Sequence, residues 1–312
     1  MNSKGIDRKA VGLLAASLLV GLSGTARADE PKFQFDKAEK LEKTLWKASA
    51  QAGLLLATGN ANALTVSAGG SLLRNDGKNK FALDVDGRFG RVTTYAANDV
   101  NGNQKIDSYD EIKTDTKVNT QFWAVKLRYD RFFSANNLGY VSAQVMGDEP
   151  AGKRLFGGAQ IGYSRQVVKT DRNELLAELG YDFTFVQFAN PPTGGPDQLL
   201  IHSLRGFLGY GLTLSKDTAL SAALEGLFNL NSLNAPGYAD PVGAFGDIRV
   251  NFKTALTTKL HKNISFRFAF TTRFDNVPAP RNALSLPYTD GFVPLAEKVD
   301  TLSEASLIVN FL

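Results

Sequence analysis

The stretch that decides the fold is ISFRFAFTTRFD, residues 264–275, in which two kinds of side chain alternate. One set of alternate positions is mainly aromatic, and the other holds small, polar and charged residues. Because successive side chains of a β-strand point to opposite faces, this stretch predicts a strand with one apolar and one polar face. Residues 79–95 and 119–133 show the same period. The chain is therefore predicted to be all-β.

About twelve such segments fit the chain, and an even number is typical of outer-membrane barrels. The connections after the even-numbered segments are short, and most of those after the odd-numbered segments are longer. This pattern predicts a transmembrane antiparallel up-and-down β-barrel with its long loops outside the cell. Alternation alone would also suit a soluble barrel with its apolar face inside. The strands are predicted at 44–58, 62–74, 79–95, 119–133, 138–146, 155–168, 174–188, 201–215, 218–231, 245–260, 264–276 and 298–312.

The beginning of the chain has the pattern of a secretory signal. Basic residues precede the apolar run 10–22, and an A-x-A site follows at 26–28. We therefore expect a signal peptide over 1–28, a periplasmic segment over 29–43 and the barrel over 44–312. The expected location is the outer membrane of a Gram-negative bacterium.

Composition excludes several classes of function. The formal net charge is +4, of which the signal segment carries +3, so the basic isoelectric point gives no argument for nucleic-acid binding. The chain has no cysteine and therefore no disulfides. It contains no HExxH, P-loop or GxSxG motif. We therefore expect the protein to have no enzymatic activity.

Several ordered motifs carry a resemblance to a known family. They are Trp46, Thr58-Gly59-Asn60, Tyr129-Asp130-Arg131, GGAQIGYSRQVV at 157–168 and LLAELGYDF at 175–183. This set resembles the DUF481 family, which is labelled as salt-induced outer membrane proteins. The resemblance implies an outer-membrane β-barrel and implies no established reaction or substrate.

The stretch DVNGNQKIDSYDE, residues 99–111, resembles a calcium loop of the D-x-N-x-N-x-x-I-D-x-x-D form. Gln104 stands where glycine usually makes the turn, and no incoming helix is evident. An Asn/Asp-rich surface loop explains the same residues without a metal. The candidate Ca²⁺ ligands are Asp99, Asn101, Asn103, the carbonyl of Lys105, Asp107 and Asp110.

Many charged residues fall on the polar face of the predicted strands. Because charge is costly on the lipid face, we expect these side chains in the barrel lumen. They would either line a pore or fill the lumen with salt bridges, and the second interpretation is favoured. They are Asp84, Asp86, Arg88, Lys126, Arg128, Asp130, Glu178, Asp182, Arg205, Glu225, Arg249, Lys253, Arg267 and Arg273.

Aromatic residues near the predicted strand ends suit the girdles that barrels place at the membrane interfaces. They are Trp46, Phe132, Phe133, Phe185, Phe188, Phe245, Phe274 and Tyr288. His202 and Ser203 are adjacent on one predicted strand and would point to opposite faces. His261 lies in a short turn. These placements argue against a serine–histidine catalytic pair.

The sequence thus predicts a porin-like barrel with a structural or envelope-adaptation role, or a narrow passive pore, with a Ca²⁺-binding loop outside. The alternatives are a barrel enzyme acting on outer-membrane lipids and a surface receptor using its long loops. Expected partners are outer-membrane lipid, lipopolysaccharide and the barrel-assembly machinery, for which the last strand ASLIVNFL is suited. Nucleic acid is not expected, and the oligomeric state is left open.

Overall fold

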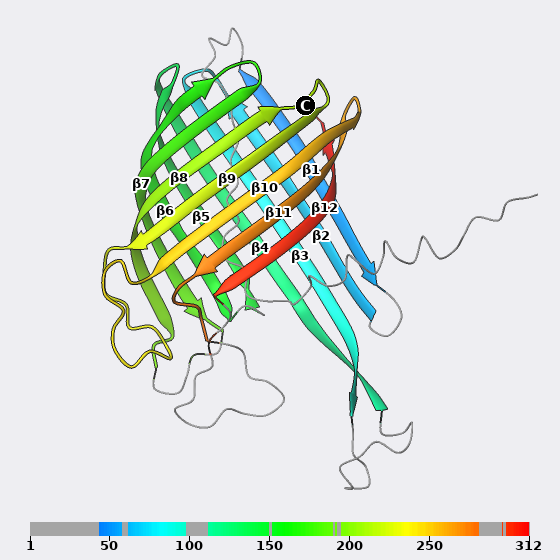
Figure 1. Cartoon of the computed structure of the whole chain (residues 1–312), viewed down its shortest axis with the longest axis vertical. Helices are drawn as coiled ribbons and strands as arrows, with labels where there is room; N and C mark the ends of the chain where they lie inside the picture. Colours follow the sequence, from blue (N-terminus) through cyan, green and yellow to red (C-terminus); the bar gives the residue numbers. More distant parts are fainter. Residues whose placement is uncertain are drawn as a thin grey trace, which may run out of the picture.

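The structure is a computed structural model that describes residues 44–57, 62–97, 112–149, 152–189, 191, 195–280, 295 and 298–311. Twelve strands form one closed barrel (Figure 1). They are β1 (Leu45–Ala57), β2 (Asn62–Asn75), β3 (Asn79–Ala97), β4 (Ile112–Ser134), β5 (Asn137–Asp148), β6 (Lys153–Lys169), β7 (Asn173–Phe188), β8 (Gln198–Thr213), β9 (Thr218–Asn229), β10 (Ile248–His261), β11 (Ile264–Asp275) and β12 (Val299–Asn310).

Each strand pairs antiparallel with the next, and β1 pairs with β12 to close the barrel. The connections after β2, β4, β6, β8 and β10 are tight turns at the end of the barrel where the C-terminus lies (Figure 1). In the first of them Gly77 has a φ of 86°, a conformation that glycine adopts without steric cost. The up-and-down topology predicted from the alternation is confirmed.

The β3–β4 hairpin is longer than predicted. Its ladder continues from Asn79↔Arg131 to Ala97↔Ile112, so residues 112–118 belong to a strand and not to the predicted loop 96–118. Most side chains of this part of β4 are exposed, and the hairpin projects beyond the other strands (Figure 1). A hairpin with water on both faces needs no apolar positions, which is why alternation gave no signal there. The β5–β6 connection, predicted to be long, joins Asp148 to Lys153.

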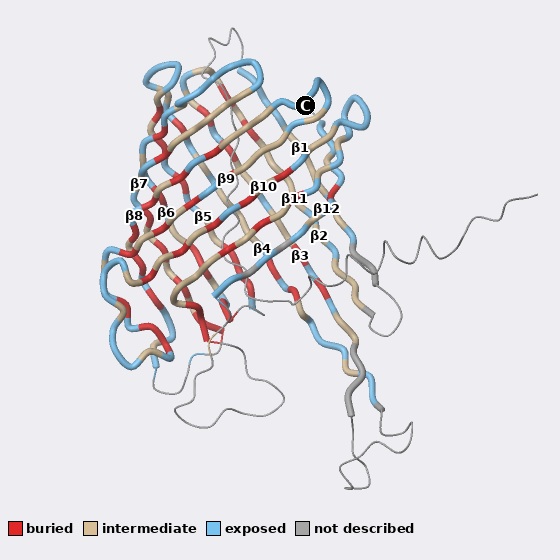
Figure 2. Tube along the Cα trace, in the orientation of Figure 1, coloured by how far each residue is buried: buried red, intermediate tan, exposed pale blue. Residues whose placement is uncertain are grey.

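The two faces of the wall differ as predicted. Arg88, Arg205 and Arg273 are buried on the inner face, whereas Leu127 and Phe268 are exposed on the outer face. Buried and exposed positions alternate along the strands in Figure 2. Because the apolar side chains point outward, the wall is suited to lipid and not to water. None of the described residues forms a helix long and apolar enough to cross a membrane.

A repeated contact orders the short-turn rim. The first residue of an odd-numbered strand is asparagine in β3, β5 and β7, and its amide oxygen accepts a hydrogen bond from a tyrosine of the following strand. The pairs are Tyr129–Asn79, Tyr163–Asn137 and Tyr210–Asn173. Each bond fixes an aromatic ring at the level where barrels carry an interfacial girdle.

Candidate functional site: the charged network across the lumen

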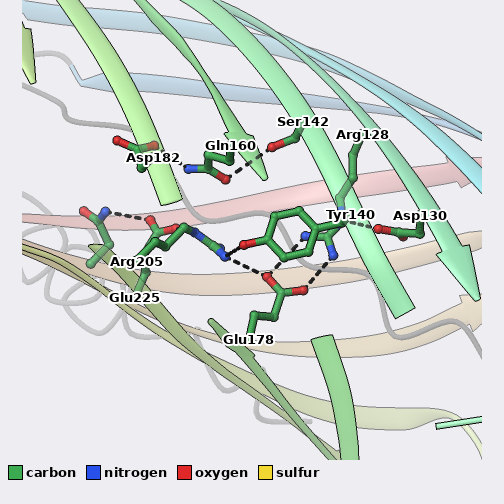
Figure 3. A network of polar contacts seen from close by, with 10 residues as sticks. Arg128, Asp130, Tyr140, Ser142, Gln160, Glu178, Asp182, Arg205 and Glu225 are labelled. Carbon is green, nitrogen blue, oxygen red and sulfur yellow. Dashed lines mark hydrogen bonds and ion pairs between the residues drawn. The ribbon is translucent and has the colours of Figure 1, made fainter. Parts of the chain in front are cut away.

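An ion pair between strands that are not neighbours runs through the lumen. Arg128 on β4 donates from Nη2 to Glu178 Oε1 on β7 at 2.6 Å. Arg205 on β8 donates from Nη1 to the other oxygen of the same carboxylate at 2.7 Å. Since β5 and β6 lie between β4 and β7 in the wall, the Arg128–Glu178 bond runs through the interior (Figure 3). The lumen is narrowed at this level.

The network extends on both sides of Glu178. Arg128 Nε donates to Asp130 Oδ1 at 2.7 Å, and Lys80 Nζ lies 2.9 Å from the other oxygen of that carboxylate. On the far side, Arg205 Nε donates to Glu225 Oε1 at 2.5 Å. Each carboxylate therefore faces at least one cation, and three bases balance three acids. Paired in this way, buried charges avoid most of the cost of leaving water.

Tyr140 on β5 lies in the middle of this network. The Arg128 guanidinium stands 4.2 Å from its ring centroid, and its hydroxyl accepts a hydrogen bond from Arg205 Nη1 at 2.9 Å. The ring finds room because Gly162 and Gly180 face it: a Cβ at either glycine would stand 2.6 Å or less from the tyrosine hydroxyl. Two glycines on neighbouring strands thus let the fully buried Tyr140 lie along the inner face of the wall, with its hydroxyl at Arg205 of β8.

The remaining inner surface is unevenly filled. A second buried chain of hydrogen bonds runs from Ser142 through Gln160 to Asp182 on β5, β6 and β7 (Figure 3). By contrast, several inner positions of β1 and β2 hold small, partly exposed residues, although Gln51 and the buried Leu73 also face inward: the small ones are Ser49, Gly53, Ser67, Gly69 and Ser71. The inner surface is therefore less tightly filled at these positions than along β4 to β8.

An apolar cluster lies inside the wall toward the long-loop end of the barrel, on the side of β4 to β8. Phe122, Phe156, Phe188 and Ile201 from the wall pack there with Leu233 of the β9–β10 connection. Asn229 holds this connection by donating to the carbonyl of Gly243 at 2.9 Å and accepting from the Asp247 amide at 2.8 Å. Phe188 was predicted for the interfacial girdle, and this prediction is wrong. Phe188 shares the parity of Glu178 and Asp182 along β7, so it faces the lumen and not the lipid.

Charged groups lie beside this cluster in a small pocket. Lys153 of β6 and Asp275 of β11, far apart around the wall, approach to 3.9 Å. Asp247, in the connection before β10, is buried, and its Oδ1 has no hydrogen-bond partner among the described residues. Burial raises the pKa of Asp247 to about 6, although Arg249 Nε at 3.4 Å opposes the shift.

Replacing Asp247 by asparagine should change how stability depends on pH. With a folded pKa of about 6 against an ordinary value of 3.8, the folded protein binds the proton more tightly and loses ~3 kcal/mol of stability as the pH rises through this interval. Relative to the wild type, the free energy of unfolding of Asp247→Asn should therefore increase by that amount between pH 4 and pH 7. Urea unfolding from vesicles measures this difference. Asp240→Asn, an exposed site in the same connection, is the control. A parallel pH dependence of the wild type and Asp247→Asn would contradict the assignment.

The sequence predicted which charged residues lie in the lumen, but it did not predict which of them pair. Of the predicted lumen charges, nine are buried and Asp84, Asp86, Lys126, Arg128 and Arg267 are intermediate. Lys80 and Tyr140 were missed. Lys80 shares the parity of Asp84 along β3, so its signal was in the sequence, whereas Tyr140 depends on Gly162 and Gly180 of two other strands.

The other candidate residues do not form a site. Ser203 points inward and accepts a hydrogen bond from Arg249 at 2.9 Å, whereas His202 stands on the outer face beside Tyr181, so the two point to opposite faces as predicted. The candidate calcium ligands, residues 99–110, lie outside the described residues. Within the described part of the chain, no group of three or more His, Asp or Glu could hold a metal ion.

A closed antiparallel barrel with an apolar outer wall and a charged interior is a transmembrane barrel of the bacterial outer membrane. Residues 50–311 match the family described as "Protein of unknown function, DUF481", and the chain belongs to that family, as the motifs predicted.

Solved structures with a similar arrangement include outer-membrane porins and channels. The NanC porin matches with a TM-score of 0.42 and 8% identity over 85% of this chain and 100% of that one. The COG4313 outer membrane channel from Pseudomonas putida F1 matches with a TM-score of 0.40 and 12% identity over 92% of this chain and 100% of that one. No curated protein matches the chain.

Proposed function

We propose that this barrel is a narrow passive pore for small polar solutes, and that its bore runs along β1 and β2. The supporting observation is the uneven filling of the lumen. Buried ion pairs occupy the side of β3 to β9, and small, partly exposed residues face inward from β1 and β2, past which Arg88 of β3 reaches Glu304 of β12. Because acids and bases are balanced in the network, we expect weak selectivity between cations and anions.

Swelling of proteoliposomes tests this function. Vesicles that contain the folded barrel should swell in glycerol and should not swell in a trisaccharide, because the network leaves only part of the cross-section free. Vesicles with heat-denatured protein are the control. Swelling in neither solute would support the alternative, a structural barrel with a closed lumen, which the burial of Glu178 and Arg205 favours.

The proposal assigns no reaction to the barrel. Its supporting observation is that His202 and Ser203 point away from each other. Mass spectrometry of phospholipid and lipopolysaccharide incubated with the folded protein should find no new lipid species. A product that forms with time and enzyme concentration would make the barrel a lipid-modifying enzyme.

We further propose that the loop of Asp99, Asn101, Asn103, Lys105, Asp107 and Asp110 binds Ca²⁺ with the weak affinity, ~10⁻⁴–10⁻³ M, of extracellular modules. The bound ion would offset the repulsion among the acids and could bridge to anionic lipopolysaccharide. Asp99→Ala with Asp107→Ala should abolish the heat of calcium binding in calorimetric titration, with little effect on barrel stability. Equal heats from the wild type and the double variant would reduce the motif to an Asn/Asp-rich loop.

A further inference from the structure

The seam between β1 and β12 is much shorter than any other in the wall. Only Ser49–Ala52 of β1 pair with Leu307–Asn310 of β12, and one more bond joins the Phe311 amide to the Ala48 carbonyl at 3.0 Å. Every other pair of neighbouring strands is joined along eleven or more positions. The ladder that closes the barrel therefore covers only one end of this seam.

The unpaired part of the seam lies toward the long loops. Beyond Ala52, β1 continues to Ala57 paired only with β2, and Val299–Ser306 of β12 pair only with β11. In Figure 1 the two strands diverge toward the end opposite the C-terminus. With the long loops outside the cell, this opening faces the outer leaflet of the membrane.

Unpaired strand edges are not stable against hydrocarbon, because their amides and carbonyls need hydrogen-bond partners. Here polar groups inside the wall can supply those hydrogen-bond partners. A Cβ on Gly53 would stand 2.5 Å from Ser67 Oγ, inside the wall, and 3.5 Å from the Ala305 carbonyl oxygen of β12, so the strands still touch at Gly53 and the unpaired edge beyond it has a small polar group directly inside. Glu304, on the unpaired part of β12, faces Arg88 of β3 at 3.4 Å. The opening therefore leads into a polar part of the lumen, where Arg88 faces Glu304 and Asp86 of β3 accepts a hydrogen bond from Gln51 Nε2 at 3.1 Å.

We propose that this seam is a lateral opening through which the polar head of an amphiphile dissolved in the outer leaflet enters the lumen. The chemistry of the entrance favours a zwitterionic head: its anionic group would meet Arg88 and its ammonium group would meet Glu304, while its chains stay in the membrane beside exposed Leu54 and Leu307. This route differs from the solute path along the barrel axis and does not depend on it.

The absence of cysteine makes the seam easy to label. A nitroxide pair at Leu56→Cys and Ser303→Cys, which a continued ladder would set opposite each other, should be farther apart in vesicles than a pair at Ala50→Cys and Val309→Cys. The second pair lies in the joined part of the seam and serves as the control. Equal separations for the two pairs would show a sealed wall and overturn the proposal.

The occupant is tested with a phosphatidylcholine that carries a nitroxide on its choline head. A fluorophore on Ser67→Cys, behind the seam, should be quenched strongly, and one on Gln144→Cys, inside the wall at β5, should be quenched weakly. Glu304→Gln should reduce the quenching at Ser67→Cys severalfold. Equal quenching at both positions, no quenching at Ser67→Cys, or equal quenching by a head-labelled anionic lipid would overturn the assignment of a zwitterionic head.

Discussion

Replacing Glu178 by alanine should destabilise the barrel by about 3–5 kcal/mol, the usual cost of removing one partner of a buried ion pair. The carboxylate accepts from Arg128 at 2.6 Å and from Arg205 at 2.7 Å, and its side chain is 1% exposed. Its loss leaves two cations facing each other across Tyr140 with Asp130 and Glu225 as their remaining acids. Urea unfolding from vesicles, followed by fluorescence or electrophoretic mobility, measures the change.

The matched control for this variant is Glu174→Ala on the same strand. Glu174 lies at the short-turn end of β7 and is partly exposed, so its removal should change stability by no more than about 0.5 kcal/mol. A loss for Glu178→Ala no greater than that of the control would mean that the network is bridged by water and is not a tight set of ion pairs.

A methyl group at Gly158 should be among the most damaging small changes in the chain. Its Cβ would stand 1.9 Å from the backbone carbonyl oxygen of Phe183 on β7, a contact that no side-chain rotation relieves. The β6 and β7 backbones must then move apart, and we expect Gly158→Ala to cost about 3 kcal/mol or more, the upper part of the range for overpacking.

Gly206→Ala is the control, since a Cβ there meets no atom within 4 Å. It should leave the unfolding midpoint nearly unchanged or raise it slightly, because alanine restricts the unfolded chain. If both variants unfold at the same urea concentration, the β6 and β7 backbones are not in close contact at Gly158.

The fold could be predicted from the sequence because one physical rule acts on every residue of the wall. In ISFRFAFTTRFD the position of each side chain in or out of the lipid follows from its parity alone, and the structure confirms it for Phe266, Phe268 and Arg273. Alternation predicts nothing where a strand has no buried or lipid-facing side. Residues 112–118 extend a hairpin with exposed side chains, so parity carried no information about them.

The site could be predicted only as a set of inward charges. Parity places Arg128, Glu178 and Arg205 in the lumen. Which of these side chains pair depends on the curvature and stagger of the closed barrel, and the sequence of a single strand predicts neither. Tyr140 depends on glycines of two other strands. Phe188, by contrast, shares the parity of Glu178 and Asp182 along β7, so its inward face could have been predicted from the sequence.

Single-channel recording in planar bilayers tests the central claim, that buried ion pairs narrow the lumen to a small bore, most directly. The wild type should show small, weakly selective conductance steps. The double variant Arg128→Ala with Glu178→Ala removes both ends of one bond across the lumen without changing the net charge, and its steps should be severalfold larger. Steps of equal size in the two proteins, or no steps in either, would contradict the account.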